Sequence, residues 1–335
     1  MSNELPKNLL GAIRYFADPD ACLDFVAEMR WPQGAICPHC TGERVSYLKT
    51  RRIWKCMNAD CHKQFSVKTQ SVLEDSPIPL DKWMVAVWMV VNCRNGVSSH
   101  EIARTVKVTQ KTGWFMLHRV RLALTAGSLE KLGGTDGGAV EVDETFVGGK
   151  IRNMHRSKVR EKYRGRSVQA HSAKVIVAGV LDRELRQVRA QVIPSIRRDT
   201  LQNMILDNVH KNSTVYTDQG TGYYNLAEKE FIHETVNHLE AYVRGEVHTN
   251  SLENFWSLLK RGLKGTYVAV EPFHLDRYVV EQVFRYNNRA TRDNPVDDRD
   301  RFMLAVSQIW GKRITYAELT GKVRGPEGKV EQAPL

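Results

Sequence analysis

Two close pairs of cysteines place the strongest constraint on how the first part of this chain can fold. Two residues separate Cys37 from Cys40, fifteen residues follow, and four residues separate Cys56 from Cys61. Each pair can lie on a turn, and the hairpin between the pairs can fold one turn against the other. This spacing is typical of a tetrahedral thiolate site. We therefore predict a zinc ribbon with a structural Zn²⁺ bound by Cys37, Cys40, Cys56 and Cys61.

Disulfide bonds are the alternative for these cysteines. The N-terminus, MSNELPKNLLGAIRYF, lacks a basic region followed by a long apolar stretch, so it is not a typical secretory signal. Cysteines that stay inside the cell are kept reduced, which favours zinc. The wider spacing of the second pair leaves His39 or His62 as a weaker candidate ligand. Cys22 and Cys93 have no partner at ligand spacing, and we predict that they are buried thiols.

The composition predicts a globular, cytoplasmic protein with a polyanionic partner. The 335 residues are 42% hydrophobic, enough for two domains or for one large domain with small modules. The densest apolar run, residues 83–91, is far shorter than the ~20 residues of a membrane span, so we expect no membrane partner. There are 49 Lys and Arg against 38 Asp and Glu, a net charge of +11. This excess favours association with DNA.

Much of the positive charge is concentrated in one segment. Residues 150–166, KIRNMHRSKVREKYRGR, contain a single acid, Glu161. Such a run is often only a solvated loop, but a basic loop beside an active site could also bind phosphates. We select as candidate DNA contacts Arg152, Arg156, Lys158 and Arg160.

The region after the cysteines reads as three helices separated by turns. Ser98 and Glu101 have the spacing of a capping box, and Thr109 can cap the last helix. A short helix, a tight turn and a longer helix suggest a helix-turn-helix, in which Gln110 and Lys111 would lie at the end that enters a major groove. The aromatic and basic residues of the ribbon could also contact DNA, or could simply pack the hairpin.

A glycine-rich segment, residues 127–138, then reads as a linker. The stretches AVEVDETFVGG, AKVIVAGVLD, VRAQVI and STVYTD after it read as strands, because they are rich in β-branched residues and partly alternate. DTLQNMILDNV reads as a helix before the last of them. Three early strands followed by alternating helix and strand predict an α/β domain with a mixed sheet. We place His233 and His238 in a further strand and give them no role.

Two acids lie where an apolar strand would otherwise be buried. Asp143 is within VEVDETF, and Asp218 ends the strand TVYTD. Each alone could be an exposed strand residue or a turn former. With Glu253 at the start of a later helix, they make three carboxylates that a mixed sheet and a packed helix can bring together. Hard oxygen donors of this kind suit two Mg²⁺ ions.

The helix that carries Glu253 should open near Asn250 and present two faces. Its apolar stripe comprises Leu252, Trp256, Leu259 and Leu263. The adjacent face comprises Glu253, Ser257, Lys260 and Lys264. A carboxylate thus shares a face with two ammonium groups. The alternative is that Asn250 caps the helix and Glu253 completes a capping box.

These features together resemble the DDE transposases and retroviral integrases, whose catalytic domain has a ribonuclease H-like fold. In that superfamily the first acid is on the first strand, the second follows the fourth strand, and the third lies on a later helix about 35 residues further on. Here 34 residues separate Asp218 from Glu253. The zinc ribbon, VEVDETFVGGK, VYTDQGTGY, HTNSLENFWSLLKRGLKGTY and FRYNNR are similar to insertion-sequence transposases with an N-terminal zinc ribbon, the ISXO2-like group. The similarity extends from about residue 22 to about residue 310.

The resemblance implies that Asp143, Asp218 and Glu253 are the catalytic triad and bind two Mg²⁺ or Mn²⁺ ions. Lys260 and Lys264 would then contact the backbone of the DNA. Three neighbouring residues have open roles. Glu141 shares the strand face of Asp143 and could be a substitute ligand, whereas Glu144 should point away. His248 could position a water or phosphate, or could be a loop or capping residue.

We divide the chain into six segments. They are an N-terminal helical segment (1–30), the zinc ribbon (31–70), a helix-turn-helix region (71–126), the linker (127–138), a ribonuclease H-like catalytic domain with a mixed sheet flanked by helices (139–310), and a disordered tail (311–335).

The resemblance implies a DNA transposase that binds the terminal inverted repeats of an insertion sequence and catalyses metal-dependent 3′-end cleavage and strand transfer. Its partners would be double-stranded DNA, as element ends and target, and further copies of the chain in a homodimer or larger assembly. A non-catalytic DNA-binding regulator and a ribonuclease H-like nuclease without joining activity are the alternatives. Three converging carboxylates disfavour the regulator, because their repulsion costs stability unless metal neutralises it. Only the family resemblance separates a transposase from the nuclease.

Overall fold

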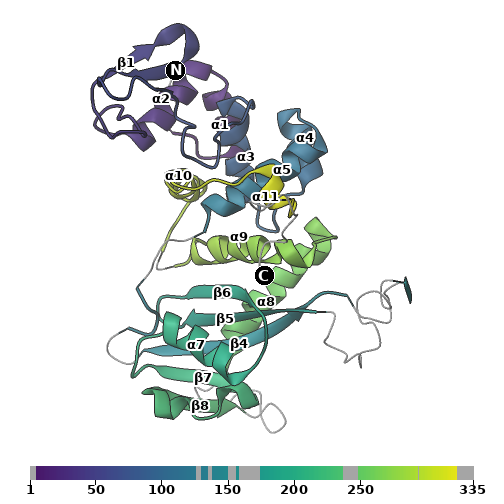
Figure 1. Ribbon diagram of the computed structural model, residues 1–335. Helices are drawn as coiled ribbons and strands as arrows, with labels where there is room; N and C mark the ends of the chain where they lie inside the picture. Colours follow the sequence, from purple (N-terminus) through teal and green to yellow (C-terminus); the bar gives the residue numbers. More distant parts are fainter. Residues whose placement is uncertain are drawn as a thin grey trace. The chain divides into compact units, whose positions relative to one another are not determined.

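The computed structural model of the protein describes residues 5–125, 130–134, 138–149, 156–157, 174–236, 248–292 and 294–322. The chain divides into two compact units, whose elements are labelled in Figure 1. The first unit combines Met1–Thr125 with Asn288–Pro334, and the second comprises Ala126–Asn287.

The first unit contains a small sheet and a set of helices. Its elements are α1 (Leu9–Phe16), α2 (Pro19–Arg30), β1 (Val45–Leu48), β2 (Ile53–Cys56), β3 (Gln64–Phe65), α3 (Leu80–Asn92), α4 (Ser99–Val106), α5 (Gln110–Ala123), α10 (Asp298–Ser307) and α11 (Tyr316–Leu319). Strands β1, β2 and β3 pair antiparallel in sequence order. This arrangement is the hairpin that the cysteine spacing predicts.

Helix α3 forms the centre of the first unit. Residues 83–91, the densest apolar run of the sequence, are all buried in it. The helix can be apolar on every side because α1, α2, α4, α5 and α10 all contact it. Within the described residues, the structure contains no helix with the length and apolar character needed to cross a bilayer.

Helices α4 and α5 form the predicted pair with a tight turn between them. Ser98 and Glu101 make the capping box of α4, and the Thr109 side chain caps α5 by accepting from the backbone N–H of Thr112. Gly113 lets the two helices approach closely, since a Cβ at this position would lie 2.8 Å from the carbonyl oxygen of Ser99. The local sequence signals therefore correctly identify these helices.

The C-terminal boundaries differ from the prediction. The segment from Asn288 onward belongs to the first unit, so the second unit ends at Asn287 rather than at residue 310. The physical reason is apolar burial, because Phe302 of α10 packs on Phe25 and Trp88. The predicted tail also starts too early: α11 lies within it, and Leu319 is buried. Residues 323–335 of the tail lie outside the described residues.

The second unit is a five-stranded mixed sheet with helices on both faces. Its elements are β4 (Ala139–Val147), β5 (Val175–Asp182), β6 (Gln187–Ile193), α7 (Arg198–Asn208), β7 (Thr214–Asp218), β8 (Ile232–Val236), α8 (Asn250–Gly262) and α9 (Leu275–Asn287). The strand order is β6-β5-β4-β7-β8. Strands β4, β5 and β6 pair antiparallel, whereas β7 and β8 run parallel to β4. The predicted mixed sheet flanked by helices is confirmed.

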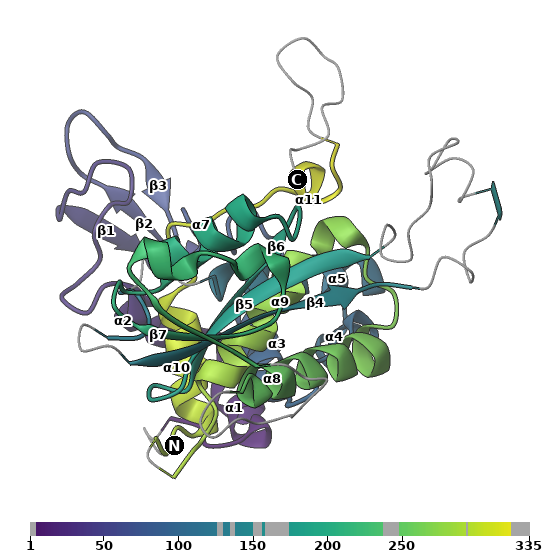
Figure 2. The same ribbon diagram turned by 90° about the horizontal axis from the view of Figure 1, so that it is seen from below.

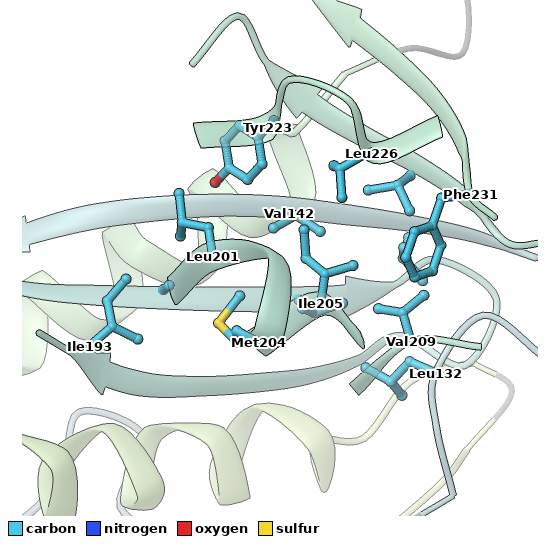
Figure 3. Packing of buried hydrophobic residues seen from close by; sticks show 14 residues of the cluster. Leu132, Val142, Ile193, Leu201, Met204, Ile205, Val209, Tyr223, Leu226 and Phe231 are labelled. Carbon is cyan, nitrogen blue, oxygen red and sulfur yellow. The ribbon is translucent and has the colours of Figure 1, made fainter. Parts of the chain in front are cut away.

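Two apolar layers hold the helices against this sheet, and Figure 2 shows α7 on one side of it and α8 on the other. Leu201, Met204 and Ile205 of α7 pack on one face of the strands, as Figure 3 shows. On the opposite face, residues of α8 and α9 pack against Val177 and Val188. The four residues of the predicted apolar stripe are all buried: Leu252, Trp256 and Leu259 lie in α8, and Leu263 lies in the π-helical turn Leu263–Tyr267 that continues it.

Part of the predicted linker belongs to the core of the second unit. Leu132 is buried there, its backbone N–H donates to the carbonyl oxygen of Asn208, and its own carbonyl oxygen accepts from His210. An apolar side chain among glycines is enough to anchor this segment. Residues 127–129 and 135–137 of the linker, and His238, lie outside the described residues, whereas His233 lies in β8 as predicted.

Candidate active site and metal centre

The first unit contains a compact group of four sulfur atoms. The Sγ atoms of Cys37, Cys40, Cys56 and Cys61 all lie within 4.8 Å of one another. Cys37 and Cys61 are 3.8 Å apart, and Cys40 and Cys56 are 3.5 Å apart. Four thiolates around zinc, with Zn–S distances near 2.3 Å, require separations of about 3.8 Å between sulfurs. The cluster therefore fits a zinc ion.

The local chemistry of the cluster agrees with metal binding. A hydrogen bond from the backbone of Gly42 lowers the pKa of Cys40 to about 7, which favours the thiolate form that binds metals. His39 and His62, the alternative ligands, are not part of the group. Cys22 is buried as predicted, whereas Cys93 is only partly buried.

The fold of the second unit brings two of the three predicted acids side by side. In the parallel pairing of β4 and β7, Glu141 is opposite Tyr216. Asp143 and Asp218 each lie two residues further along, so they share the same face of neighbouring strands. Asp218 is the last residue of β7, and its Oδ1 accepts from the backbone N–H of Gly220 at 3.0 Å.

Glu253 faces the same region from the first turn of α8. A cleft of about 530 Å³ is lined by both Asp143 and Glu253. Its other lining residues are Glu144, Thr145, Trp256, Ser257, Lys260, Arg261 and Lys264. All four residues of the predicted polar face line this cleft: Glu253, Ser257 and Lys260 from α8, and Lys264 from the π-helical turn that follows it.

Burial and like charge act together on Asp143. Burial, followed by the negative charges of Glu144 and Asp218, raises the pKa of Asp143 to about 7. The pKa of Glu144 is raised by burial and by Asp218. Such a concentration of negative charge beside a cleft is the donor chemistry that suits a divalent cation. Among the described residues, the four cysteines are the group of three or more potential ligands that converge closely enough to hold a metal ion, so the three acids form a looser group.

Two aromatic residues hold the acids in place and were not identified as functional from the sequence. The indole Nε1 of Trp256 donates to Oδ2 of Asp143 at 2.9 Å, although its position predicts only an apolar contact. The Tyr223 hydroxyl donates to Glu144 on the opposite face of β4, the direction that alternation predicts for Glu144. An aromatic residue three positions after a candidate acid on a helix was the available signal for Trp256.

The start of α8 differs from the capping alternative. The helix begins at Asn250 with Thr249 as its N-cap, and no side chain of this segment caps it, so Asn250 and Glu253 do not form a capping box. Instead, the Glu141 side chain accepts from the backbone N–H of Leu252 at 2.9 Å. Glu141 is thus engaged with the helix rather than exposed as a substitute ligand.

The candidate DNA contacts lie in several places. Lys260 and Lys264 line the cleft, and burial lowers the pKa of Lys260 even though Asp143 opposes this shift. Gln110 and Lys111 are exposed at the start of α5, where Gln110 donates to the Ser99 hydroxyl at 2.8 Å. Arg156 is exposed. The other three candidates lie outside the described residues: Arg152, Lys158 and Arg160.

Comparisons with known proteins match both parts of the chain. A family model described as an ISXO2-like transposase domain matches residues 135–287, and one described as a transposase zinc-ribbon domain matches residues 17–64. The first match extends over the five-stranded sheet, α7, α8 and α9, and the second over the four cysteines.

Two relatives carry similar descriptions. A Halobacterium salinarum protein named "Uncharacterized protein in transposable element ISH50" is 28% identical over 260 residues, which are 75% of this chain and 85% of that protein. A Haemophilus influenzae protein named "Uncharacterized transposase-like protein" is 31% identical over 102 residues, which are 30% of this chain and 82% of that protein.

Among solved structures, a simian T-cell lymphotropic virus intasome in complex with PP2A regulatory subunit B56 gamma aligns with a TM-score of 0.30 at 13% identity. The alignment covers 62% of this chain and 70% of that chain. The domain matches and the relatives are sufficient: this chain belongs to the ISXO2-like transposase family that carries an N-terminal zinc ribbon.

Proposed function

We propose that this protein binds the terminal inverted repeats of its insertion sequence and catalyses 3′-end cleavage and strand transfer with Asp143, Asp218 and Glu253 as the metal-binding acids. One observation carries the proposal. Asp143 and Glu253 line one cleft with Lys260 and Lys264, and the charge of Asp218 acts on Asp143. Acids for a cation and lysines for a phosphate backbone thus meet on one surface.

The side chains of this cleft have separate tasks in the proposed reaction. Two bound Mg²⁺ or Mn²⁺ ions would supply Lewis-acid activation of the attacking oxygen and stabilisation of the departing 3′ oxygen. The three carboxylates would hold these ions. Trp256 orients the Asp143 carboxylate, and Lys260 and Lys264 would hold the DNA backbone at the cleft.

The first unit would supply DNA recognition. The exposed start of α5 carries Gln110 and Lys111 and has the form of a recognition helix behind a tight turn. The zinc ribbon and the excess of Lys and Arg would add contacts with double-stranded DNA. Because two element ends must be processed together, we propose a homodimer or a larger assembly on DNA.

The decisive experiment supplies purified protein with labelled DNA that carries the element ends, with Mg²⁺ or Mn²⁺. Wild type is compared with Asp218→Asn and Glu253→Gln, and products are resolved by length. We expect end-specific nicking and joined products that require metal and are lost in both variants. An exposed acid that is not part of the cleft lining provides the matched control, and Glu230→Gln should retain activity.

The other outcomes point to the alternatives. Metal-dependent cutting without joining, even when a pre-cut end is supplied, would indicate that the protein is a nuclease and not a transposase. DNA binding without cutting by any of the proteins would indicate a non-catalytic regulator.

The salt dependence of DNA affinity tests the proposed backbone contacts separately. Each lysine that neutralises a phosphate contributes about 0.9 to the slope of log affinity against log salt. Lys260→Ala and Lys264→Ala should therefore each reduce the slope by about 1. Lys211→Ala is the control, because Lys211 pairs with Glu230 and is not part of the cleft lining. An unchanged slope in both cleft variants would show that neither lysine neutralises a DNA phosphate.

A further inference from the structure

Glu141 is a fully buried carboxylate two residues before Asp143 on the same face of β4. Its relative exposure is 0%. Its Oε1 accepts from Nε of Arg183 at 2.8 Å, and its Oε2 accepts from the backbone N–H of Leu252 at 2.9 Å. A buried carboxyl group is tolerated only when it is paired and hydrogen-bonded, as Glu141 is here.

The contacts of Glu141 and its partner Arg183 reach every element that carries a proposed catalytic acid. Leu252 immediately precedes Glu253 on α8. The guanidinium of Arg183 stacks on the ring of Tyr216, 4.3 Å from its centroid, and Tyr216 lies two residues before Asp218 on β7. Glu141 itself is on β4 with Asp143. One ionic group therefore connects β4, β7 and α8 next to the three acids.

Glu141 also caps α8 from outside the helix, since the N-cap residue Thr249 makes no side-chain capping bond. The first turn of a helix has unpaired backbone N–H groups and a partial positive charge, both of which favour a carboxylate. Because successive helix residues are rotated by about 100°, a bond to the N–H of Leu252 fixes the direction in which Glu253 leaves the helix. The hydrogen bond to Glu141 of β4 thus fixes the rotation of α8 about its axis and its distance from the sheet at this end.

The same arginine holds the residue that leads into α8. Its NH2 group donates to the carbonyl oxygen of His248 at 2.6 Å and contacts His248 Nδ1 at 2.9 Å. A guanidinium has no acceptor, so His248 Nδ1 can only accept in this contact. His248 Nδ1 also lies 3.4 Å from Oε1 of Glu141, so the arginine, the glutamate and the histidine form one group.

We infer that Glu141, together with Arg183, is a positioning residue that holds Glu253 in place relative to Asp143 and Asp218 for metal binding. This inference rests on the proposed function. Both oxygens of Glu141 already accept hydrogen bonds and the residue is buried, so it acts through α8 rather than as a metal ligand.

The test compares Glu141→Gln with Glu281→Gln in the full-length protein. Glu281 is the matched control because it is equally buried, pairs with Arg285, and lies on α9 of the same unit. Mn²⁺ binding is measured by electron paramagnetic resonance, and the Mg²⁺ concentration for half-maximal cleavage is measured in parallel. Residues that orient metal ligands typically contribute a factor of about 10 to 100 in metal affinity. We expect a loss of this size for Glu141→Gln, with unchanged metal dependence for Glu281→Gln.

A purely structural role would lower the unfolding temperature of both variants and leave Mn²⁺ binding alike in the two, which would overturn the inference. If Glu141→Gln does not fold, Arg183→Lys replaces it. A lysine keeps the charge but cannot donate to Glu141 and His248 as the guanidinium does, and we expect weakened Mn²⁺ binding with retained fold. Unchanged Mn²⁺ binding by Arg183→Lys would overturn the inference as well.

Asp218→Asn separates this test from that of the function. If wild type binds Mn²⁺ through Asp218 but does not cut DNA, the proposed reaction fails while the comparison of Glu141→Gln with Glu281→Gln still decides the positioning role. Mn²⁺ binding that is insensitive to Asp218→Asn would overturn both.

Discussion

At the scale of single residues, Gly179 is essential to the geometry around Asp143. The two residues pair across β5 and β4. A Cβ on Gly179 would lie 2.9 Å from the Trp256 ring, whose indole N–H donates to Asp143. The absent side chain therefore provides the space that the tryptophan needs to reach the acid.

Gly179→Ala should destabilise the second unit by about 1–3 kcal/mol, the usual result of overpacking. Chemical denaturation measures this change. Gly265→Ala is the control, because a Cβ at Gly265 would meet nothing within 4 Å. Equal stability of the two variants would show that Trp256 can move aside at no cost.

Sequence reasoning succeeded for residues whose environment repeats along the chain. Helical periodicity predicts the apolar stripe and the polar face of the helix that begins at Asn250. The prediction of the polar face is confirmed, because all four of its residues line the same cleft. The role of Glu141 could not be predicted in this way. Its contact with Leu252 joins a strand to a helix 111 residues later, and no local pattern encodes such a pair.

At the scale of elements, the capping box of α4 gives the stability of the first unit a pH-dependent component. Bonding to the Ser98 backbone N–H lowers the pKa of Glu101. A lowered folded-state pKa means that this stabilisation is present above the unfolded-state pKa of about 4.3 and is lost as the pH falls through the folded value.

Glu101→Ala should therefore lower the free energy of unfolding of the first unit by about 0.3–1.5 kcal/mol at pH 7. The difference from wild type should shrink below about pH 4. Urea denaturation at several pH values measures it. Glu101→Gln keeps an acceptor without the charge. The free energy of unfolding of this variant should therefore lack the pH-dependent contribution of Glu101. A difference that stays constant down to acidic pH would exclude the ionised cap.

The zinc ribbon is an element that should depend on its metal. A small hairpin has little apolar core, so binding energy is folding energy for such modules. Chelation should disorder β1, β2 and β3, which changes the fluorescence of the packed Trp31 and Trp54, whose ring centroids are 5.3 Å apart. The sheet of the second unit should persist in circular dichroism spectra.

The cysteine variants test the ligand set directly. Cys56→Ser should lose bound zinc, as measured by metal analysis, whereas Cys22→Ser should keep it because Cys22 is outside the cluster. Retention of zinc by Cys56→Ser would contradict four-cysteine coordination. The ribbon could be predicted because the spacing of its ligands is local in the sequence. Although four residues separate Cys56 from Cys61, both belong to the cluster.

At the scale of the whole molecule, the chain returns to its first unit after completing the second. Phe302 of α10 packs against Phe16, Phe25 and Trp88, all from the first part of the sequence. The amino-acid composition does not predict that the segment after Asn287 belongs to the first unit. Residues 298–307 form a helix with an apolar face that could belong to either unit, and only the packed structure assigns it.

Phe302→Ala should cost the first unit about 3–5 kcal/mol. Calorimetry should show a lower transition temperature for that unit and no change for the second. Leu304→Ala, an exposed position on the same helix, should have little effect. A lowered transition of the second unit alone would reverse the assignment of α10.

The discontinuous first unit imposes an order of events during synthesis. The surfaces of α1 and α3 that Phe302 covers are synthesised before the second unit, whereas Phe302 itself is synthesised after it. Roughly 160 residues separate the two parts, which at 5–20 residues per second is a delay of about 8 to 30 s. During that interval the half-finished unit exposes aromatic surface. A translation product truncated before α10 would thus contain the full sheet of the second unit and lack a completed core in the unit proposed to read DNA.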